Sequence, residues 1–225
     1  MVNGIQIAID GPAGAGKSTV AKMAAEKLGF TYIDTGAMYR ALTHKALTDH
    51  IDINDEDAMK RLLLHTDIHL LPSAKGQAVL LDGEDVSEAI RTQEVTKAVS
   101  AVAAHPSVRL LMVDKQRQLA NNKGVVMDGR DIGTDVLPHA QLKIFLTASV
   151  EERALRRFKE NDGRGIHTSL EQLQADISER DRADSERKAS PLRQAEDAIL
   201  VDSTSMTIGD VVEKIRELAE ERMVR

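Results

Sequence analysis

Residues 11–18 read Gly-Pro-Ala-Gly-Ala-Gly-Lys-Ser, and this stretch decides the fold. It matches the pattern Gly-x-x-x-x-Gly-Lys-[Ser/Thr] without a mismatch, and it lies between an apolar run at 5–9 and a helical pattern at 18–28. In such a loop, successive backbone N–H groups converge on phosphate oxygens, and the N-terminus of the next helix adds partial positive charge. Lys17 would contact the β- and γ-phosphates, and the Ser18 hydroxyl would bind Mg²⁺. The stretch therefore predicts a strand, a phosphate-binding loop and a helix that bind a nucleoside triphosphate.

The composition excludes several other classes of protein. The 225 residues carry 30 Lys and Arg against 36 Asp and Glu, a net charge of −6, and only 2% are aromatic. This balance disfavours a nucleic-acid partner, which would require a basic surface or a base-stacking platform. No apolar run exceeds four residues, which excludes a membrane span, and the absence of cysteine fits the reducing cytoplasm. We expect a cytoplasmic monomer that acts on small molecules.

Short apolar runs alternate with helical patterns along the chain. They predict strands at 5–9, 31–34, 124–128, 142–146 and 198–202. Continuous apolar strands that alternate with helices indicate a parallel sheet covered on both faces, so the fold class is α/β. The capping-box patterns Ser149-x-x-Glu152 and Thr168-x-x-Glu171 predict two helix starts, and Pro106 fits a first helical position.

The segment at about 65–85 departs from this alternation. Apolar runs at 67–71 and 77–81 flank a Pro-Ser-Ala-Lys-Gly turn, which predicts an antiparallel hairpin. The residues 82–85 then predict another turn. We interpret the hairpin as an insertion within a single domain.

A phosphate-binding loop alone does not separate a GTPase from a kinase. A GTPase would carry Asn-Lys-x-Asp, but the nearest string, at 122–125, lacks the aspartate. A GTPase switch would also read Asp-x-x-Gly, whereas residues 128–131 read Asp-Gly-Arg-Asp. These absences favour a kinase, whose second substrate must also be bound.

Arginine is concentrated where an anionic acceptor could bind. Eight of the 17 arginines fall in residues 151–193. At helical spacing, the apolar stripe of Leu170, Leu173 and Ile177 continues into Arg180, Asp184 and Arg187. Charges on an inward face need partners, which either a bound anion or structural ion pairs would provide.

Two further clusters follow predicted strands. Residues 34–40 read Asp-Thr-Gly-Ala-Met-Tyr-Arg, and residues 128–131 follow the third strand. Ligands of parallel α/β sheets bind at the carboxyl ends of the strands. Each cluster is either part of such a site or a helix cap with a surface ion pair.

Taken together, these motifs resemble the bacterial cytidylate kinases of the nucleoside monophosphate kinase family. The matching stretches are 9–17, 34–40, 83–87 with 90–92, 100–109, 128–133, 179–181 and 202–204. The resemblance implies a P-loop NTPase core with a five-stranded parallel sheet, a small antiparallel insertion and a helical lid. The core would comprise about 1–39, 106–149 and 190–225, the acceptor-binding region about 40–105, and the lid about 150–167. It also implies transfer of the ATP γ-phosphoryl group to CMP or dCMP, with Mg²⁺ accompanying ATP.

The resemblance also implies which residues bind each substrate. ATP would contact Gly11, Pro12, Ala13, Gly14, Ala15, Gly16, Lys17, Ser18 and Thr19. The acceptor would contact Thr35, Gly36, Arg40, Ser100, Arg109, Arg130, Asp131, Arg180, Asp184 and Arg187. Among these, the acceptor phosphate would be held by Arg40, Arg130 and Arg180. Cytosine would be read by Ser100, Arg109 and Asp131, and the ribose would be bound by Asp184 beside Arg187.

Lid arginines would close over the phosphoryl group, with Arg153, Arg156 and Arg157 as candidates and Arg164 unassigned. The candidate catalytic residues are thus Lys17, Arg130, Asp131, Arg156 and Arg157. The competing hypotheses are a kinase for UMP, a purine monophosphate or shikimate, and a regulatory nucleotide-binding switch. The three cytosine-reading residues favour CMP over the other acceptors.

Overall fold

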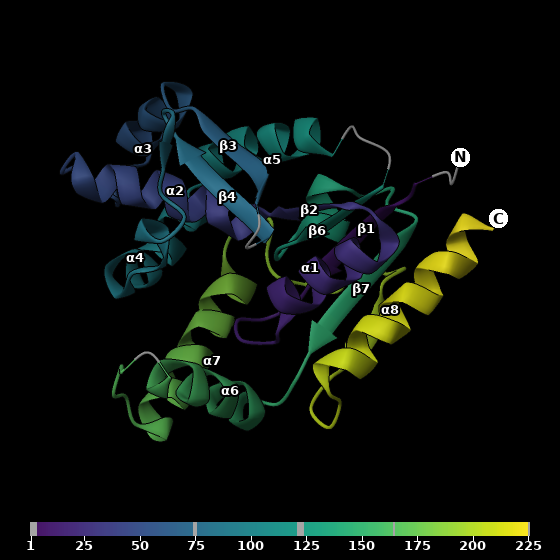
Figure 1. The fold of residues 1–225 in the computed structure, drawn as a ribbon. Coiled ribbons are helices and arrows are strands. Elements are labelled where there is room, and N and C mark those ends of the chain that lie inside the picture. The colour runs from purple at the N-terminus through teal and green to yellow at the C-terminus, as the bar shows by residue number, and fades with distance from the viewer. Residues whose placement is uncertain (1–3, 74–75, 121–123, 164, 225) are drawn as a thin grey trace.

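The computed structural model describes residues 4–73, 76–120, 124–163 and 165–224 (Figure 1). Its central sheet has five parallel strands: β1 (Gln6–Asp10), β2 (Thr31–Asp34), β6 (Val125–Asp128), β7 (Leu142–Thr147) and β8 (Ile199–Asp202). Their spatial order is β2-β6-β1-β7-β8. The α/β prediction and its five strands are confirmed, each strand within about two residues of its predicted bounds.

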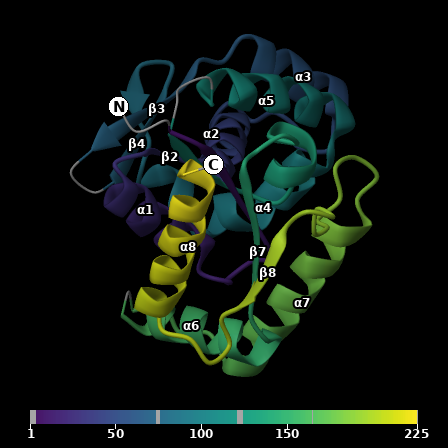
Figure 2. The same ribbon diagram turned by 90° about the vertical axis from the view of Figure 1, so that its right-hand side faces the viewer.

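Helices cover both faces of this sheet. On one face, α1 (Lys17–Leu28) packs beside α8 (Ile208–Met223), as Figure 2 shows. On the other face lie α5 (Pro106–Leu119) and a short π-helical turn, η2 (Ile132–Val136). Ile7 and Ile9 of β1 join the core under α1 and α8, whereas Ala8 joins the core on the opposite face. Side chains alternate between the two faces of a strand, so a strand that is buried on both faces is apolar throughout.

A second apolar core lies in the region of residues 35–112, at the carboxyl end of the sheet. It is built by α2 (Thr35–Thr48), α3 (Glu56–Leu64), η1 (Ala89–Arg91) and α4 (Gln93–Ala104), with part of α5. Strands β3 (Ile68–Ser73) and β4 (Gly76–Leu81) form the predicted antiparallel hairpin. Its turn residues 74–75 lie outside the described residues, as do residues 122–123.

The prediction of a turn over 82–85 is only half right. Asp82 and Gly83 have φ of 51° and 91° and make the turn. Glu84 and Asp85 then form a third antiparallel strand, β5, against β4. Two residues are too few to show an alternating pattern in the sequence, so periodicity could not reveal this strand.

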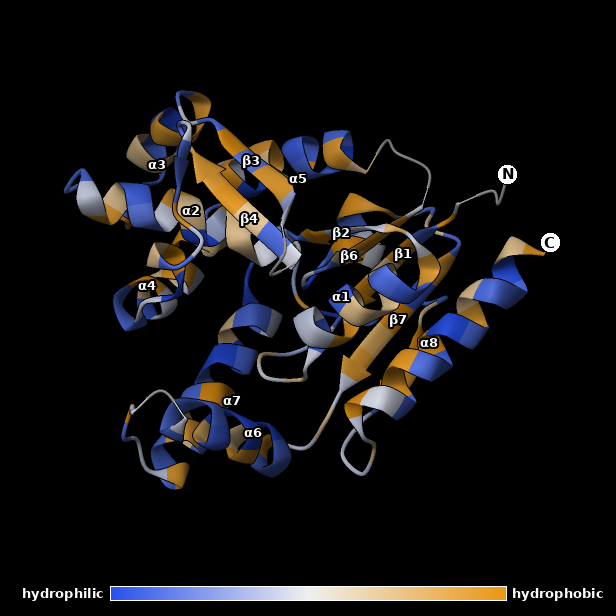
Figure 3. Cartoon of the chain, in the orientation of Figure 1, coloured by the Kyte–Doolittle hydropathy of each residue, from blue (hydrophilic) through white to orange (hydrophobic). Residues whose placement is uncertain are grey.

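The remaining helices, α6 (Val150–Asp162) and α7 (Leu170–Glu186), pack against each other beside the phosphate-binding loop. Figure 3 shows them largely blue, in contrast to the orange strands of the central sheet. Ser149 caps α6 as predicted, accepting from the Glu152 N–H at 3.1 Å. The predicted cap at Thr168 is wrong, because Ser169 takes that role and accepts from the Gln172 N–H at 3.1 Å. Among the described residues, no helix combines the length and apolarity that crossing a bilayer requires.

Candidate active site

The phosphate-binding loop joins β1 to α1 with a backbone that requires glycine. Gly11 has a φ of 147°, and a Cβ there would lie 1.9 Å from the Leu146 carbonyl oxygen of β7. No side chain fits so close to another backbone. Lys17 follows the loop, is buried, and donates from Nζ to the Pro12 carbonyl at 2.8 Å. Burial, and then the charge of Arg130, lower the pKa of Lys17 well below its ordinary value, so a bound anion would strengthen its charged form.

Acidic side chains lie beside the loop because of the register of the sheet. Asp34 of β2 is paired with Asp128 of β6 at the carboxyl ends of their strands. Asp128 accepts from the Ser18 hydroxyl at 2.8 Å and from the Tyr32 hydroxyl at 2.9 Å. Burial, and then the charge of Asp34, raise the pKa of Asp128 to about 7. The result is an all-oxygen cluster with negative charge directly at the phosphate loop.

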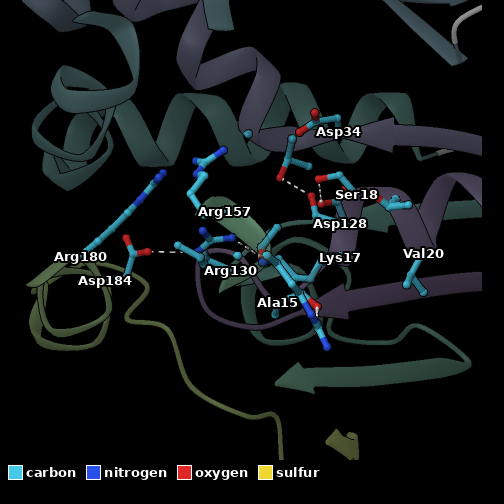
Figure 4. A pocket seen from close by; sticks show the side chains of 18 of the residues that line it. Ala15, Lys17, Ser18, Val20, Asp34, Asp128, Arg130, Arg157, Arg180 and Asp184 are labelled. Atoms are coloured by element: carbon cyan, nitrogen blue, oxygen red, sulfur yellow. Dashed lines mark hydrogen bonds and ion pairs between the residues drawn. The ribbon is translucent and has the colours of Figure 1, made fainter. Parts of the chain in front are cut away.

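Arginines gather across from this cluster. Figure 4 shows Arg130, Arg157 and Arg180 gathered near Asp184. Arg130 donates from Nε to Asp184 at 3.0 Å, whereas the buried Nε of Arg180 has no hydrogen-bond partner among the described residues. Burial, and then the charge of Arg130, lower the pKa of Arg180 to about 10. Positive charge therefore exceeds what Asp184 neutralises, which favours a bound anion over purely structural ion pairs.

A buried ion pair occupies the far end of the same region. Arg109 of α5 donates to Asp131, and both side chains are at most 6% exposed. The Arg109 guanidinium also lies 5.4 Å from the centre of the Tyr39 ring, within reach of a cation–π contact. Arg187 approaches Asp131 at 3.9 Å and Asp184 at 3.5 Å. These groups offer hydrogen-bond donors and an acceptor on one wall, as recognition of a polar ring requires.

One cavity of about 790 Å³ connects the loop, the arginines and this ion pair. Its volume is typical of a site that encloses small-molecule ligands. Most of the residues predicted from the sequence line it: Ala13, Gly14, Ala15, Gly16, Lys17, Ser18, Thr19, Thr35, Gly36, Arg40, Ser100, Arg109, Arg130, Asp131, Arg156, Arg157, Arg180, Asp184 and Arg187.

Comparison with known proteins identifies the family. Residues 7–221 match the sequence model of the family described as cytidylate kinase. The chain belongs to the cytidylate kinase family.

Its relatives match at full length. A cytidylate kinase from Lysinibacillus sphaericus (strain C3-41) is 59% identical over 224 residues, covering 100% of both chains. One from Bacillus subtilis (strain 168) is 56% identical over 218 residues, covering 97% of both chains. A solved gluconokinase from Sinorhizobium meliloti 1021 is 14% identical with a TM-score of 0.52, covering 98% of this chain and 94% of that one, and shows a shared fold alone.

Within this cytidylate kinase fold, three of the predicted residues do not line the cavity. Gly11 packs against the β7 backbone, and Pro12 contributes its carbonyl to Lys17. Arg153 is also buried elsewhere, with Nε donating to the Ala148 carbonyl at 2.9 Å. The expectation that Arg153 reaches the phosphoryl group is therefore not met in this conformation. Arg164 lies outside the described residues.

The two other arginines that the sequence predicted for a lid of this cytidylate kinase family member reach the cavity from α6. Arg156 donates from Nη2 to the Ser203 carbonyl at 2.7 Å, which ties it to the segment that follows β8. Arg157 forms an ion pair at the surface with Glu160 at 3.2 Å. Because Arg157 lies beside Arg130 and Arg180 in Figure 4, it has the position expected of a group that contacts a transferred phosphoryl.

Sequence reasoning missed several residues that line the cavity. On the loop side they are Met206, Thr207, Ile208 and Val211, which follow β8. Asp34, Tyr39, Arg91 and Asp128 also line it; the sequence placed them within candidate clusters or matching stretches but gave none of them a role of its own. The position of Asp34 and Asp128, each at the end of a predicted strand, does indicate a place in the site. The apolar residues Met206, Ile208 and Val211 could not be told apart from residues that pack a helix against the core.

Proposed function

We propose that this chain transfers the γ-phosphoryl group of ATP to CMP or dCMP, giving ADP and CDP or dCDP. The observation that carries this proposal is the continuous cavity that runs from Lys17 past Arg180 to the buried Arg109–Asp131 pair, where Arg180 Nε finds no hydrogen-bond partner in the part of the chain that the structure describes. Membership of the cytidylate kinase family supports the identity of the acceptor. Phosphoryl transfer requires positioning and charge stabilisation more than covalent chemistry, and an arginine-lined cavity offers both.

The ATP end would be the loop and the segment after β8. The backbone N–H groups of residues 13–19 would bind the phosphates together with Lys17. Adenine would lie against the apolar wall of Met206, Ile208 and Val211, which lines the cavity near Arg156. Arg156 and Arg157 would contact the phosphates from α6.

The acceptor end would be the arginine cluster and the ion pair. Arg40, Arg130 and Arg180 would bind the CMP phosphate, since the planar arginine fork matches phosphate oxygens. Ser100, Arg109 and Asp131 would read cytosine, with Asp131 accepting from the N4 amino group. Asp184 would bind the ribose hydroxyl beside Arg187, and Thr35 and Gly36 would line the passage between the two substrates.

Magnesium fits the acidic side of the site. Mg²⁺ prefers oxygen ligands, and the Ser18 hydroxyl lies in contact with the Asp128 carboxylate, with Asp34 beside it. A cation there would offset the burial and the repulsion that raise the pKa of Asp128. When bound, Mg²⁺ would neutralise charge on the β- and γ-phosphates.

We also propose a division of labour within a single P-loop kinase domain. Residues 1–39, 106–149 and 190–225 would form the core, 40–105 the acceptor-binding region, and 150–167 the lid. The absence of cysteine and of any spanning helix among the described residues supports action in the cytoplasm. One chain supplies the whole cavity, which supports a monomeric enzyme.

The test is ADP formation from ATP and Mg²⁺ with a panel of monophosphates: CMP, dCMP, UMP, AMP and GMP. We expect CMP and dCMP to stimulate turnover far above the rate without acceptor. A CMP rate equal to the acceptor-free rate would overturn the kinase proposal. Preferential use of AMP or GMP would overturn the assignment of the acceptor while leaving the kinase chemistry intact.

A further inference from the structure

Both backbone groups of Ala13, in the phosphate-binding loop, are held by side chains from outside the loop. The Ala13 carbonyl accepts from Arg153 Nη1 of α6 at 3.0 Å. The Ala13 N–H donates to Asp181 Oδ1 of α7 at 3.4 Å. Arg153 Nη1 and Asp181 Oδ2 are themselves 2.6 Å apart. Two helices that are distant from the loop in sequence thus meet at one residue of the loop.

Arg153 is built into this position. Its side chain is only 5% exposed, and Nε is committed to the Ala148 carbonyl at 2.9 Å. Its stem packs on the loop so closely that a Cβ on Gly14 would lie 3.3 Å from Arg153 Cβ. A buried guanidinium is tolerated only when its donors are satisfied, and here the loop itself satisfies one of them.

The Arg153–Asp181 pair adds no net charge near the phosphates, so it does not act as another phosphate ligand. A loop with positive φ at Gly11, Gly14 and Gly16 can adopt many conformations when nothing holds it. Fixing such a loop in advance lowers the entropy cost of binding a ligand. The pair is placed to do this, because it holds the loop at Ala13, two residues after the point where the β7 backbone contacts it at Gly11.

We propose that Arg153 and Asp181 are positioning residues that preorganise the phosphate loop for the donor nucleotide and link its shape to the packing of α6 on α7. This inference rests on the proposed function, in which the loop binds ATP. It assigns Arg153 a role other than contact with the transferred phosphoryl group. Because equilibrium coupling is reciprocal, a donor nucleotide that favours this loop shape also stabilises the α6–α7 arrangement.

The test compares Asp181→Asn and Arg153→Met with wild type and with Arg182→Ala. Arg182 neighbours Asp181 on α7 and does not line the cavity, so it is a matched control. Calorimetric titration with ADP and, separately, with CMP measures binding without turnover. We expect a rise of about tenfold in the ADP dissociation constant for both Asp181→Asn and Arg153→Met, and a change of less than twofold in the CMP dissociation constant. Arg182→Ala should leave both constants unchanged.

Two further measurements complete the experiment. The double variant should lose little more ADP affinity than either single variant, because the two side chains pair with each other and act through the same loop residue, Ala13. Circular dichroism checks that each variant is folded. If Arg153→Met does not fold, Asp181→Asn still tests the proposal, because asparagine keeps the size of the aspartate side chain and one of its acceptor oxygens.

Unchanged ADP affinity in folded Asp181→Asn would overturn the proposal, and so would an equal loss for CMP and ADP. The ADP titration does not depend on the acceptor. If CMP fails to support turnover in wild type, the proposed function is contradicted. The ADP titration of the variants still tests the role of Arg153 and Asp181 in that case.

Discussion

Asp131 lies where base recognition is proposed, and its surroundings determine what it can do. It is 4% exposed, pairs with Arg109, and has Arg187 3.9 Å away. Both guanidiniums can only donate hydrogen bonds, so the carboxylate oxygens are the acceptors on this wall. Such a group suits the N4 amino group of cytosine and disfavours the O4 carbonyl of uracil.

Asp131→Asn is expected to lower kcat/KM for CMP by about 100-fold, or about 2.7 kcal/mol, because Arg109 loses its charged partner in a buried site. The ratio of kcat/KM for CMP to that for UMP should also fall, since an amide can donate to O4. Steady-state kinetics with both acceptors measures this. The control is Asp114→Asn, on the α5 helix that carries Arg109, where the exposed pair with Arg117 at 3.7 Å contributes little. An equal loss for both variants would contradict the proposed base site.

Asp10 shows how a buried carboxylate positions the site without lining the cavity. Its two oxygens accept from the Ile132 N–H at 2.8 Å and the Gly133 N–H at 2.7 Å, directly after Arg130 and Asp131. Burial raises its pKa from 3.8 to about 6, although both hydrogen bonds oppose this rise. The folded protein therefore binds a proton at Asp10 more tightly than the unfolded chain does.

A raised pKa in the folded state contributes stability that is fully present below about pH 4 and is lost as the pH rises through about 6. The stability of wild type relative to Asp10→Asn should therefore fall by about 1 to 2 kcal/mol between pH 5 and pH 7.5. Urea unfolding at pH 5, 6 and 7.5 measures the difference. A difference that grows with pH would show that the pKa of Asp10 is lowered in the folded protein.

At the scale of elements, α7 combines two functions along one stripe. Leu173 and Ile177 are each 7% exposed and pack with Ala154 of α6 in a small cluster. One and two turns further on, the same face carries Arg180 and Asp184 into the cavity. The helix thus uses its first half for attachment to α6 and its second half for the site, as the 3.6-residue period predicted.

Because this apolar cluster is small, Ile177→Ala should weaken α6 and α7 locally, by about 2 to 4 kcal/mol. Hydrogen exchange followed by mass spectrometry should show faster exchange in residues 150–186 while the central sheet stays protected. The control is Ser178→Ala, the exposed neighbour on the same helix. Equal acceleration across the sheet would show that this helix pair unfolds only together with the core.

At the scale of the whole molecule, the cavity lies between two apolar cores. One core lies between the central sheet and helices α1 and α8 and contains Ile9 and Ile144, and the other surrounds α2 and contains Leu42 and Met112. Residues of both regions line the cavity, so a ligand there contacts both. Binding that requires the folded arrangement of both regions stabilises the entire protein.

CMP alone, at 100 times its dissociation constant, should therefore stabilise the fold by about 2.7 kcal/mol. For a chain of this length that corresponds to a rise in Tm of about 5 to 10 °C, measured by differential scanning calorimetry. AMP at the same concentration should raise the Tm much less. Equal shifts for AMP and CMP would argue against a cytosine-selective acceptor site.

The sequence was sufficient for features that depend on neighbouring residues. The loop at 11–18, the five strands, the hairpin and the α7 stripe each follow from a local pattern of polarity, glycine and spacing, because these patterns reflect hydrogen bonding and burial within one element. The sequence did not predict the third antiparallel strand, because a strand of two residues has no period. It also did not predict the Ser169 cap, because two adjacent hydroxyl residues, Thr168 and Ser169, could each cap the helix.

Only the tertiary structure decided which side chains meet. The strand order β2-β6-β1-β7-β8 places Asp128 beside Ser18, and no local pattern sets that order. The same packing gives different partners to two arginines that lie one turn apart on α6. Arg157 lines the cavity, whereas Arg153 donates to the Ala13 carbonyl. The physical reason is that a charged side chain is bound by whatever partners surround it, and those partners come from elements up to 168 positions away.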